Sequence, residues 1–542
     1  MQLIKSEFNR LELYLISIII LIIYILGAMT DIMDVDAGQY AAMSRQMLET
    51  GDFLQVRDRV EEYLDKPPFL FWISALSIKI FGVYSWSYKL PSILFSLLGI
   101  YSTYSLSKLL YNQKAGILAA MILASCQAVF LMNQDVRTDN ILSSAIIFSL
   151  WQLVAFIQNA RMIHLVFGFV GIGIAMLTKG PIGLMMPVFA LSSYFIYNKQ
   201  WKFFFKWEWM LGLVIVAVML LPMCIGLYQQ HGTHGLYFYF WEQSFGRITG
   251  ENHWRNDTTI LYFTHTFLWA FLPWSFLFVM AFYDRTIELF KNKNTENTYE
   301  ALSWGGFILT FIAFSLSKYK LPHYIFITFP LAAILCSSWL TSLLEREKRN
   351  LLKRLSIVQM FVSVLLFVAA SMLIYAFPPD STILWLVLLS LLIWCSISSF
   401  LSKDKFRSVV FTAIYSILFA NLLLNGNFYP QLYKYQAASV AGKLFHENSK
   451  TGEGLYYLNL GSRSLDYYAR IIAKPFHEEV KDSAWIFTDE AGLENLKTKG
   501  INLNNVTELK KYSVQFLSLA FLNPKTRESR FEKNYLIHLT NQ

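Results

Sequence analysis

Thirteen apolar runs, each about as long as a membrane-spanning helix, constrain the fold of this chain more than any other feature. A helix needs about 20 apolar residues to cross the hydrocarbon core of a bilayer, with a range of about 17–25. Only 15% of the 542 residues are charged, whereas soluble domains carry roughly 25%. The sequence therefore predicts a polytopic all-α membrane protein. The runs lie near residues 12–30, 90–110, 115–132, 141–158, 163–178, 181–198, 209–228, 261–283, 302–317, 322–342, 355–377, 382–401 and 408–424.

The placement of basic residues supports this count. With the N-terminus in the cytoplasm, the cytoplasmic connections hold nineteen lysines and arginines, and the short outside loops hold six. Membrane proteins show this asymmetry because basic residues favour the cytoplasmic side. We therefore expect the C-terminus outside. The net charge of +9 is explained by topology, so it does not indicate a nucleic-acid partner.

Several familiar motifs are missing. All four cysteines lie in apolar runs, which argues against a disulfide framework or a zinc knuckle. The first run lacks a small-residue cleavage site, so we expect it to remain as a span. The sequence contains no P-loop or dinucleotide fingerprint, and we expect no nucleotide cofactor.

Two outside segments are long enough to carry function. The first, residues 31–89, includes a 13-residue apolar helix at 69–81, which is too short to span and is predicted to lie at the membrane interface. The second, residues 426–542, reads as a small α/β domain, with strands at 454–459 and 484–488 followed by helices at 464–469 and 491–499. We therefore divide the chain into a membrane domain, 1–425, and a C-terminal domain, 426–542.

Charged residues gather at the outside ends of the spans, where they are candidates for chemistry. Asp36 could accept a proton from an attacking hydroxyl, and Lys66 could hold a phosphate as a compact point charge. The alternative is that Asp34 and Asp36 only cap the following helix.

Five motifs in this order resemble the GT-C superfamily of membrane glycosyltransferases. Within it the chain looks most like bacterial 4-amino-4-deoxy-L-arabinose (aminoarabinose) lipid A transferases and protein O-mannosyltransferase relatives. The resemblance extends over residues 10–425. The motifs are Asp36-x-x-x-Tyr40, Tyr63-x-Asp65-Lys66-Pro-Pro, Arg137-x-Asp139, Leu177-Thr-Lys-Gly180 and Ser317-x-x-Lys320-Leu-Pro-x-Tyr324.

The resemblance implies a GT-C fold of thirteen spans with a C-terminal domain in the periplasm of the bacterial inner membrane. It implies that Asp36 is the catalytic carboxylate, that Tyr40, Tyr63 and Lys66 line a donor phosphate site, and that Lys320 and Tyr324 close the cavity. Two positions depart from the family pattern. Ala37 replaces a second acid, and Asp65 replaces a longer Glu before Lys-Pro, which weakens any transfer of a metal site.

Other charged residues have competing explanations. Arg137 and Asp139 belong to the family motif, while Arg247 and Arg255 could grip phosphate or extend toward lipid headgroups. Lys179 sits in a Thr-Lys-Gly-Pro break, where it could bind phosphate or extend to the interface. Asp65, His253 and His323 could bind zinc, magnesium or manganese, although no paired-histidine spacing supports this and both histidines could be hydrogen-bonded loop residues.

These patterns favour an inverting glycosyltransferase that moves a sugar from undecaprenyl phosphate to an acceptor on the periplasmic side. The acceptor is expected to be lipid A or another envelope glycolipid, and protein hydroxyls are the alternative. A lipid or solute transporter is the alternative of another class, but it would place ionisable residues near the bilayer midplane. The sequence contains no signal for an oligomeric state.

Overall fold

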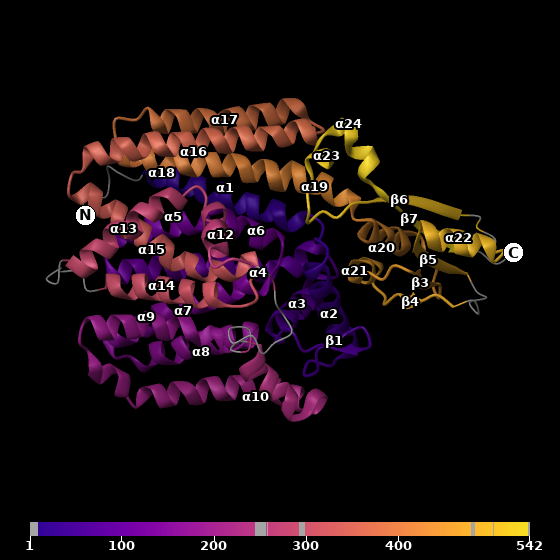
Figure 1. Ribbon diagram of the computed structural model, residues 1–542, viewed down its shortest axis with the longest axis horizontal. Coiled ribbons are helices and arrows are strands. Elements are labelled where there is room, and N and C mark those ends of the chain that lie inside the picture. Colours follow the sequence, from indigo (N-terminus) through magenta and orange to yellow (C-terminus); the bar gives the residue numbers. More distant parts are fainter. Residues whose placement is uncertain are drawn as a thin grey trace.

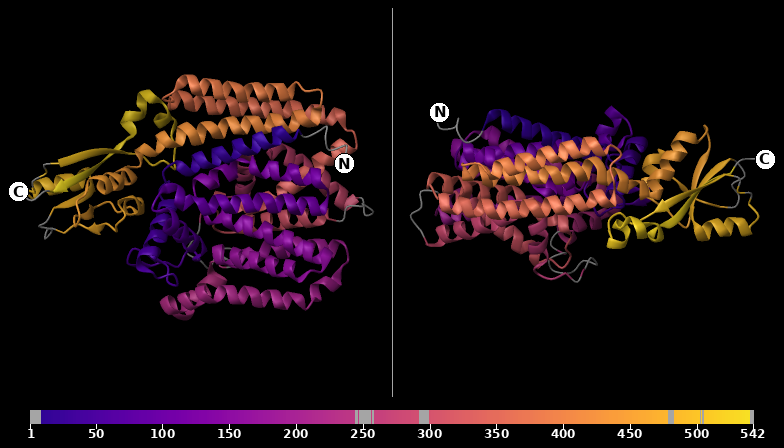
Figure 2. Two further views of the ribbon diagram at one scale, coloured as in Figure 1. Left: turned by 180° about the vertical axis from the view of Figure 1, so that it is seen from behind. Right: turned by 90° about the horizontal axis from the view of Figure 1, so that it is seen from above.

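The protein consists of a bundle of long helices with a mixed β-sheet at one end (Figure 1). The computed structural model describes residues 9–243, 246, 256, 258–291, 299–477, 483–501, 503 and 505–539. The two further views show that the sheet and its helices extend beyond the end of the bundle along its long axis (Figure 2).

In the described part of the chain, nine helical stretches are long and apolar enough to cross a membrane on their own. Three of the stretches include short 3-10 or π segments next to helices whose ranges follow below. η3 (Phe238–Glu242) extends α10, and η4 (Pro322–Thr328) precedes α15. The helix α18 is extended by η5 (Leu424–Phe428), α19 (Tyr429–Leu432) and η6 (Tyr433–Tyr435). The nine are built on α1 (Arg10–Met29), α4 (Ser85–Leu110), α7 (Thr138–Asn159), α8 (Met162–Lys179), α10 (Glu208–Tyr237), α15 (Phe329–Glu345), α16 (Arg349–Ala376), α17 (Thr382–Phe400) and α18 (Lys405–Leu423).

Four of the expected spans take a different form. Two are bent pairs: α5 (Gln113–Ala124) with α6 (Gln127–Gln134), at 52°, and α12 (Tyr262–Ala270) with α13 (Ser275–Lys291), at 119°. The other two, α9 (Ile182–Tyr197) and α14 (Glu300–Leu316), are helices of 16 and 17 residues. Every predicted run is thus helical, and nine to eleven spans pass by length and composition, so the count of thirteen stays a prediction.

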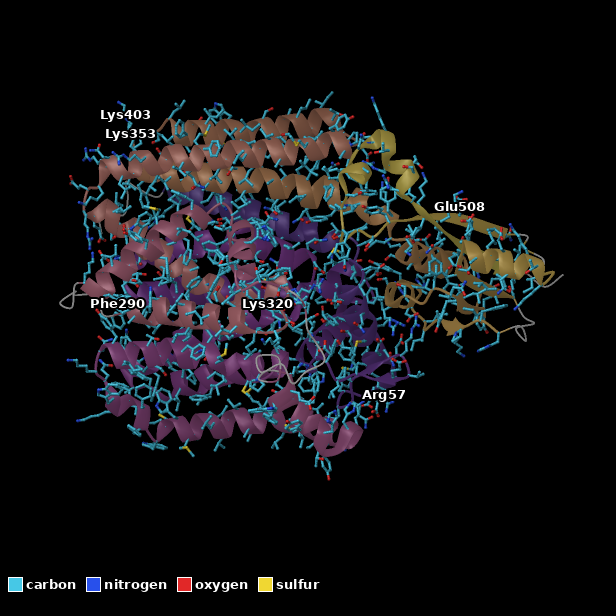
Figure 3. All side chains as sticks on the ribbon, in the orientation of Figure 1. Arg57, Phe290, Lys320, Lys353, Lys403 and Glu508 are labelled. Atoms are coloured by element: carbon cyan, nitrogen blue, oxygen red, sulfur yellow. The ribbon has the colours of Figure 1, made fainter. Side chains whose placement is uncertain are left out.

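The charged loops separate to the two ends of the bundle. Lys353 and Lys403, which we predicted to be cytoplasmic, lie together at one end, whereas Arg57 and Glu508 lie at the other (Figure 3). This separation is what the distribution of basic residues requires. Which end faces the cytoplasm stays a prediction.

The predicted break between the fifth and sixth runs is present. Helix α8 ends at Lys179, Gly180 follows with φ +81°, and α9 begins after Pro181. Glycine takes this left-handed conformation without steric cost, and proline fits the start of a helix. The break therefore places Lys179 at the end of the bundle that carries the first loop.

The first loop folds as a compact unit on this end. Helices α2 (Asp36–Thr50) and α3 (Phe69–Phe81) flank a short hairpin, β1 (Arg57–Asp58) and β2 (Glu61–Glu62). Phe71 and Tyr40 are buried in its core, which also receives Tyr467 from the C-terminal region. The 13-residue helix is as predicted, and its place at a membrane interface stays a prediction.

The C-terminal region forms a five-stranded sheet of order β4-β3-β5-β7-β6. Strand β3 pairs in parallel with β4 and β5, while β7 pairs antiparallel with β5 and β6. The predicted strands correspond to β3 and β5. The strands are β3 (Gly454–Leu458), β4 (Lys474–Pro475), β5 (Ala484–Asp489), β6 (Asn505–Lys511) and β7 (Glu532–Leu539).

Both faces of this sheet are covered by helices. Alternate side chains of a strand point to opposite faces, so Trp485 and Phe487 pack on one side and Ile486 on the other. The first face carries α20 (Ala437–Asn448) and α21 (Arg463–Ala469), and the second carries α22 (Glu490–Thr498). The remaining short helices are η2 (Trp201–Phe205), α23 (Leu519–Leu522), α24 (Pro524–Arg527) and η7 (Glu528–Arg530).

Aromatic contacts hold this region against the bundle. Phe377, at the end of α16, packs with Phe428 and Phe521. The guanidinium of Arg527 lies 4.1 Å from the ring centroid of Phe377. Met33 of the first loop packs on the same aromatic cluster, so the C-terminal region contacts both the bundle and the first loop.

Candidate active site

Asp36 is the first residue of α2 and remains accessible. Its side chain is 43% exposed. Val35 is the N-cap of α2, and the cap makes no side-chain hydrogen bond, while the neighbouring Asp34 carboxylate accepts a hydrogen bond from Ser464. Neither aspartate side chain therefore caps α2.

Arg137 joins Asp36 to a second carboxylate. Its Nη1 forms an ion pair with Oδ2 of Asp36, and its Nε lies 2.9 Å from Oδ2 of Asp135. Burial raises the pKa of Asp135, and the Arg137 guanidinium opposes that rise. Arg137 precedes α7 in an extended conformation, so the start of this helix aims its guanidinium toward α2. The result is a fixed carboxylate with one oxygen engaged.

Two tyrosines lie behind Asp36. Tyr40 and Tyr63 both pack edge-to-face against Phe71, with ring centroids 5.8 and 6.2 Å away. Burial, followed by the nearby Tyr63 and Asp36, raises the pKa of Tyr40 well above its usual value. Burial and Asp65 likewise raise the pKa of Tyr63. The two phenol side chains also hydrogen-bond to each other, so they form one connected polar group near Asp36.

Asp139, in the first turn of α7, organises a second cluster. Its Oδ1 lies 2.5 Å from Nζ of Lys179, and its Oδ2 lies 3.6 Å from Nε2 of His323. The Lys179 ammonium also lies 3.9 Å from the ring centroid of Tyr324. Asp139 is 1% exposed and Lys179 is 8% exposed, so each charge is compensated where water is excluded.

Lys66 lies at the mouth of these clusters. Its Nζ is 2.5 Å from Oδ2 of Asp65, and its charge acts on Asp139 and His323. The Gln243 amide, from the segment after α10, donates to the backbone oxygen of Asp65. Lys66 is 13% exposed, and it is therefore placed to meet an anion that enters the site.

Lys320 contacts the segment that precedes α12. Its Nζ donates to the backbone oxygen of Thr258 over 3.3 Å, and its backbone pairs with Asn256. Burial lowers the pKa of Lys320, and the nearby Lys318 lowers it further. Figure 3 places Lys320 toward the end of the bundle that carries the first loop. Three further candidates, Arg247, His253 and Arg255, lie outside the described residues.

The described candidates for a metal site do not meet at one point. Asp65 is engaged by Lys66, while His323 faces Asp139. Within the described ranges, no three His, Cys, Asp or Glu side chains lie close enough to hold a metal ion. With His253 outside those ranges, a metal site stays a prediction, and no chemical step below depends on one.

Comparisons with known proteins show which families and folds the chain is similar to. Residues 65–225 match the family described as dolichyl-phosphate-mannose-protein mannosyltransferase. An undecaprenyl phosphate-alpha-4-amino-4-deoxy-L-arabinose arabinosyl transferase of Wigglesworthia glossinidia brevipalpis is 25% identical, over 98% of this chain and 91% of its own length. The undecaprenyl phosphate-alpha-4-amino-4-deoxy-L-arabinose arabinosyl transferase 2 of Proteus mirabilis is 24% identical over 62% of this chain and 60% of its own length. The chain therefore matches less than two thirds of that relative.

A solved structure shares the fold. The crystal structure of ArnT from Cupriavidus metallidurans bound to undecaprenyl phosphate superposes with a TM-score of 0.76 at 18% identity, covering 98% of this chain and 99% of the other. The chain resembles the GT-C membrane glycosyltransferases. The likeness predicted from five motifs is confirmed. Direct contacts join four of the motifs, through Asp36, Arg137 with Asp139, Lys179 and Tyr324.

Sequence reasoning missed Asp135 as a member of the GT-C-like site. From the sequence we assigned it no role. The signal was present, because Asp135, Arg137 and Asp139 alternate in charge over five residues just before a span. In a water-poor environment, charges this close in sequence need ion-pair partners, either one another or residues elsewhere in the chain.

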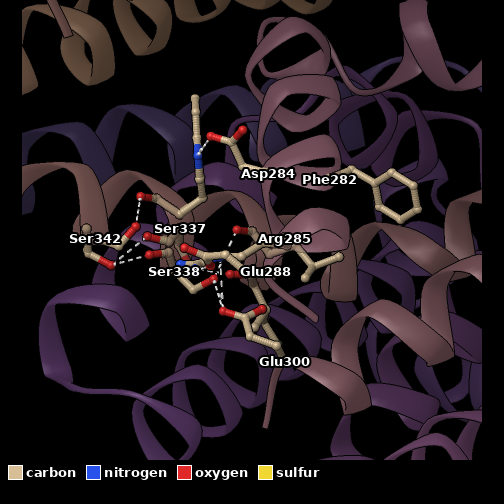
Figure 4. A network of polar contacts seen from close by, with 12 residues as sticks. Phe282, Asp284, Arg285, Glu288, Glu300, Ser337, Ser338 and Ser342 are labelled. Atoms are coloured by element: carbon tan, nitrogen blue, oxygen red, sulfur yellow. Dashed lines mark hydrogen bonds and ion pairs between the residues drawn. The ribbon is translucent and has the colours of Figure 1, made fainter. Parts of the chain in front are cut away.

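A second buried polar network lies at the opposite end of the bundle (Figure 4). Arg285 contacts Glu288 and lies 3.0 Å from Oε1 of Glu300, whose carboxylate accepts a hydrogen bond from Ser338. From the sequence, Arg285 was counted only among the residues that set topology. In the structure it also ties α13 to α14.

Proposed function

We propose that the protein is an inverting glycosyltransferase that transfers a sugar from a polyprenyl phosphate donor to an acceptor hydroxyl. The observation that carries the proposal is the accessible Asp36 carboxylate, which Arg137 fixes near Tyr40 and Tyr63. The named relatives support the donor class, since their printed names contain undecaprenyl phosphate.

The reaction needs a base on one side of the sugar. The acceptor hydroxyl attacks the anomeric carbon and loses its proton to the free carboxylate oxygen of Asp36. As the new glycosidic bond forms, the bond between the anomeric carbon and the phosphate oxygen breaks. The phosphate leaves with the bonding electron pair, and a single displacement inverts the anomeric configuration.

The leaving phosphate requires positive charge and hydrogen-bond donors. Lys66 would supply a compact charge by exchanging its contact with Asp65 for one with the phosphate, while Tyr40 and Tyr63 supply phenolic groups. Groups aimed at the position where charge develops contribute most when they are already fixed. Lys179 is held by Asp139 and Tyr324, so its part is to shape the site.

The proposal extends to the cell. We place the protein in the bacterial inner membrane as a multi-pass protein, with thirteen spans, a cytoplasmic N-terminus and a periplasmic C-terminal domain of residues 426–542. Lipid A or another envelope glycolipid is the proposed acceptor. The description of the matching family favours a second candidate, transfer to protein hydroxyls.

The test is Asp36→Asn in the purified, full-length protein. We expect loss of sugar transfer by about 10²–10⁴-fold, the usual share of a general base. Asp380→Asn is the matched control, because Asp380 is an exposed loop residue at the same end of the bundle. Mass spectrometry of envelope glycolipids and proteins from cells with and without the protein would identify sugar and acceptor. Unchanged transfer by the Asp36 variant would refute the base assignment.

A further inference from the structure

A cavity of about 570 Å³ lies between the start of α2 and the C-terminal sheet. This volume falls within the roughly 300–1,000 Å³ of typical ligand sites. Asp34 and Val35, directly before the candidate base Asp36, form part of its wall, as does Gln39 one turn along α2. The opposite wall comes from the sheet and its loops, including Ser513 and Asn534.

The two walls are held together by hydrogen bonds around Asp34. Its backbone N–H donates to Oε1 of Gln436 over 2.7 Å, and its backbone oxygen accepts from Nε2 of Gln515 over 2.5 Å. Its carboxylate accepts from Ser464. The cavity is therefore a fixed joint between two parts of the chain that are far apart in sequence.

Both cations in the lining are neutralised within the protein. Nε of Arg463 lies 3.0 Å from Oδ1 of Asp58, and Nζ of Lys511 lies 2.7 Å from Oε2 of Glu532. Burial raises the pKa of Asp34, the carboxyl group facing them. A phosphate would have to compete with these acidic partners, so the charge balance favours an uncharged ligand.

The lining also offers an amide without a partner. Asn534 is 3% exposed, lines the cavity and, in the described part of the chain, has no side-chain hydrogen bond. An amide carries one acceptor oxygen and two donor hydrogens. Saccharide hydroxyls both donate and accept, so they match such a group.

We propose that this cavity binds an uncharged saccharide portion of the acceptor. That the bound saccharide belongs to the acceptor rests on the proposed function. Val35 and Gln39 connect the cavity to the helix that carries Asp36, so a bound saccharide would lie beside the base. The C-terminal sheet would thereby select the acceptor, while the bundle holds the donor.

The experiment measures binding of two probes to the purified, full-length protein by saturation-transfer NMR. The probes are an N-acetylglucosamine disaccharide and the same disaccharide carrying a 1-phosphate. Ser513→Trp fills the cavity and is expected to abolish binding of the neutral probe. Asn534→Leu removes the amide at similar size and should weaken it about tenfold, the value of a neutral hydrogen bond. Ser529→Trp, on an exposed turn outside the cavity, is the matched control and should bind as wild type.

Retained polyprenyl phosphate binding confirms that each variant is folded. The inference is overturned if the wild type does not bind the neutral probe, if only the phosphorylated probe binds, or if both cavity variants bind like the control. Failure of the proposed function looks different. In that case the wild type transfers no sugar, yet its binding of the neutral probe still responds to Ser513→Trp.

Discussion

Replacing Arg137 by lysine tests whether the candidate base depends on a guanidinium for its position. Arg137 contacts Asp36 through Nη1 and Asp135 through Nε, so its fork bridges two carboxylates. Lysine keeps the charge but has one ammonium group on a flexible stem. It cannot reproduce both contacts with the same geometry.

The expected size follows from one lost contact. Hydrogen bonds to charged groups contribute about 1.5–3 kcal/mol each, and the Arg137 side chain is only 15% exposed, so screening by water is limited. At 1.36 kcal/mol for each factor of ten, a misplaced Asp36 should lower kcat by about 10- to 150-fold. Donor affinity should change little, because Lys66 and the tyrosines are unaltered.

The assay is transfer of a radiolabelled sugar from polyprenyl phosphate, with kcat and KM measured separately. Arg530→Lys, at an exposed position in η7, is the matched control. Arg137→Met should behave differently, because it leaves Asp135 buried without its cation and costs about 3–5 kcal/mol of stability. A wild-type kcat in Arg137→Lys would refute the positioning argument, as would a change confined to the donor KM.

Three other expectations follow from the same contacts. Lys66→Ala should weaken polyprenyl phosphate binding about tenfold, because it removes one charge-assisted contact. An unchanged affinity in isothermal titration calorimetry would contradict the phosphate role. Asp139→Asn should lower the free energy of unfolding in detergent by about 3–5 kcal/mol, because it leaves Lys179 buried without its counter-charge. Adding Lys179→Met should restore part of the lost stability. Additive losses in the double variant would argue against the pairing. Burial would raise the pKa of Glu453, but hydrogen bonds from Ser483 and Trp485 lower it to about 2. Because the folded pKa lies below the unfolded value of about 4.5, this contribution to stability is present above pH 4.5 and is lost as the pH falls toward 2. Trp485 fluorescence should report the loss, and Glu453→Gln should flatten that part of the profile.

Local features of the chain were predictable from sequence. The Thr-Lys-Gly-Pro break, the 13-residue helix α3 and the strands β3 and β5 all appear where the pattern indicated. Each depends on neighbours within a few residues: glycine at a positive φ, an apolar run of fixed length, or alternation along a strand. β6 and β7, which are more polar and lie beyond these signals, were not predicted.

The partners of the site residues could not be predicted. Asp36 meets Arg137 across 101 residues, and Asp139 meets Lys179 across 40. Composition identifies such residues as costly in a membrane protein and hence as candidates, but several partners of the right charge are available to each. Only the packing of α2, α7 and α8 selects one. For the same reason the sequence left Lys179 open between phosphate binding and extension to the interface, and it did not predict the contacts with Asp139 and Tyr324.

The two kinds of basic residue in this chain differ in burial, and the difference has a physical cause. Lys353 and Lys403 are exposed at one end of the bundle and require no partner (Figure 3). Arg137, in contrast, is nearly buried and bridges two carboxylates. The segment of residues 135–139 therefore joins three distant elements: α2 through Asp36, the end of α8 through Lys179, and η4 through His323. Each ion pair of residues 135–139 is stable only if its partner element is in place. This five-residue segment therefore couples the first loop, the break after α8 and η4. A change at any of the three should thus disturb the position of Asp36, even when the changed residue never contacts it.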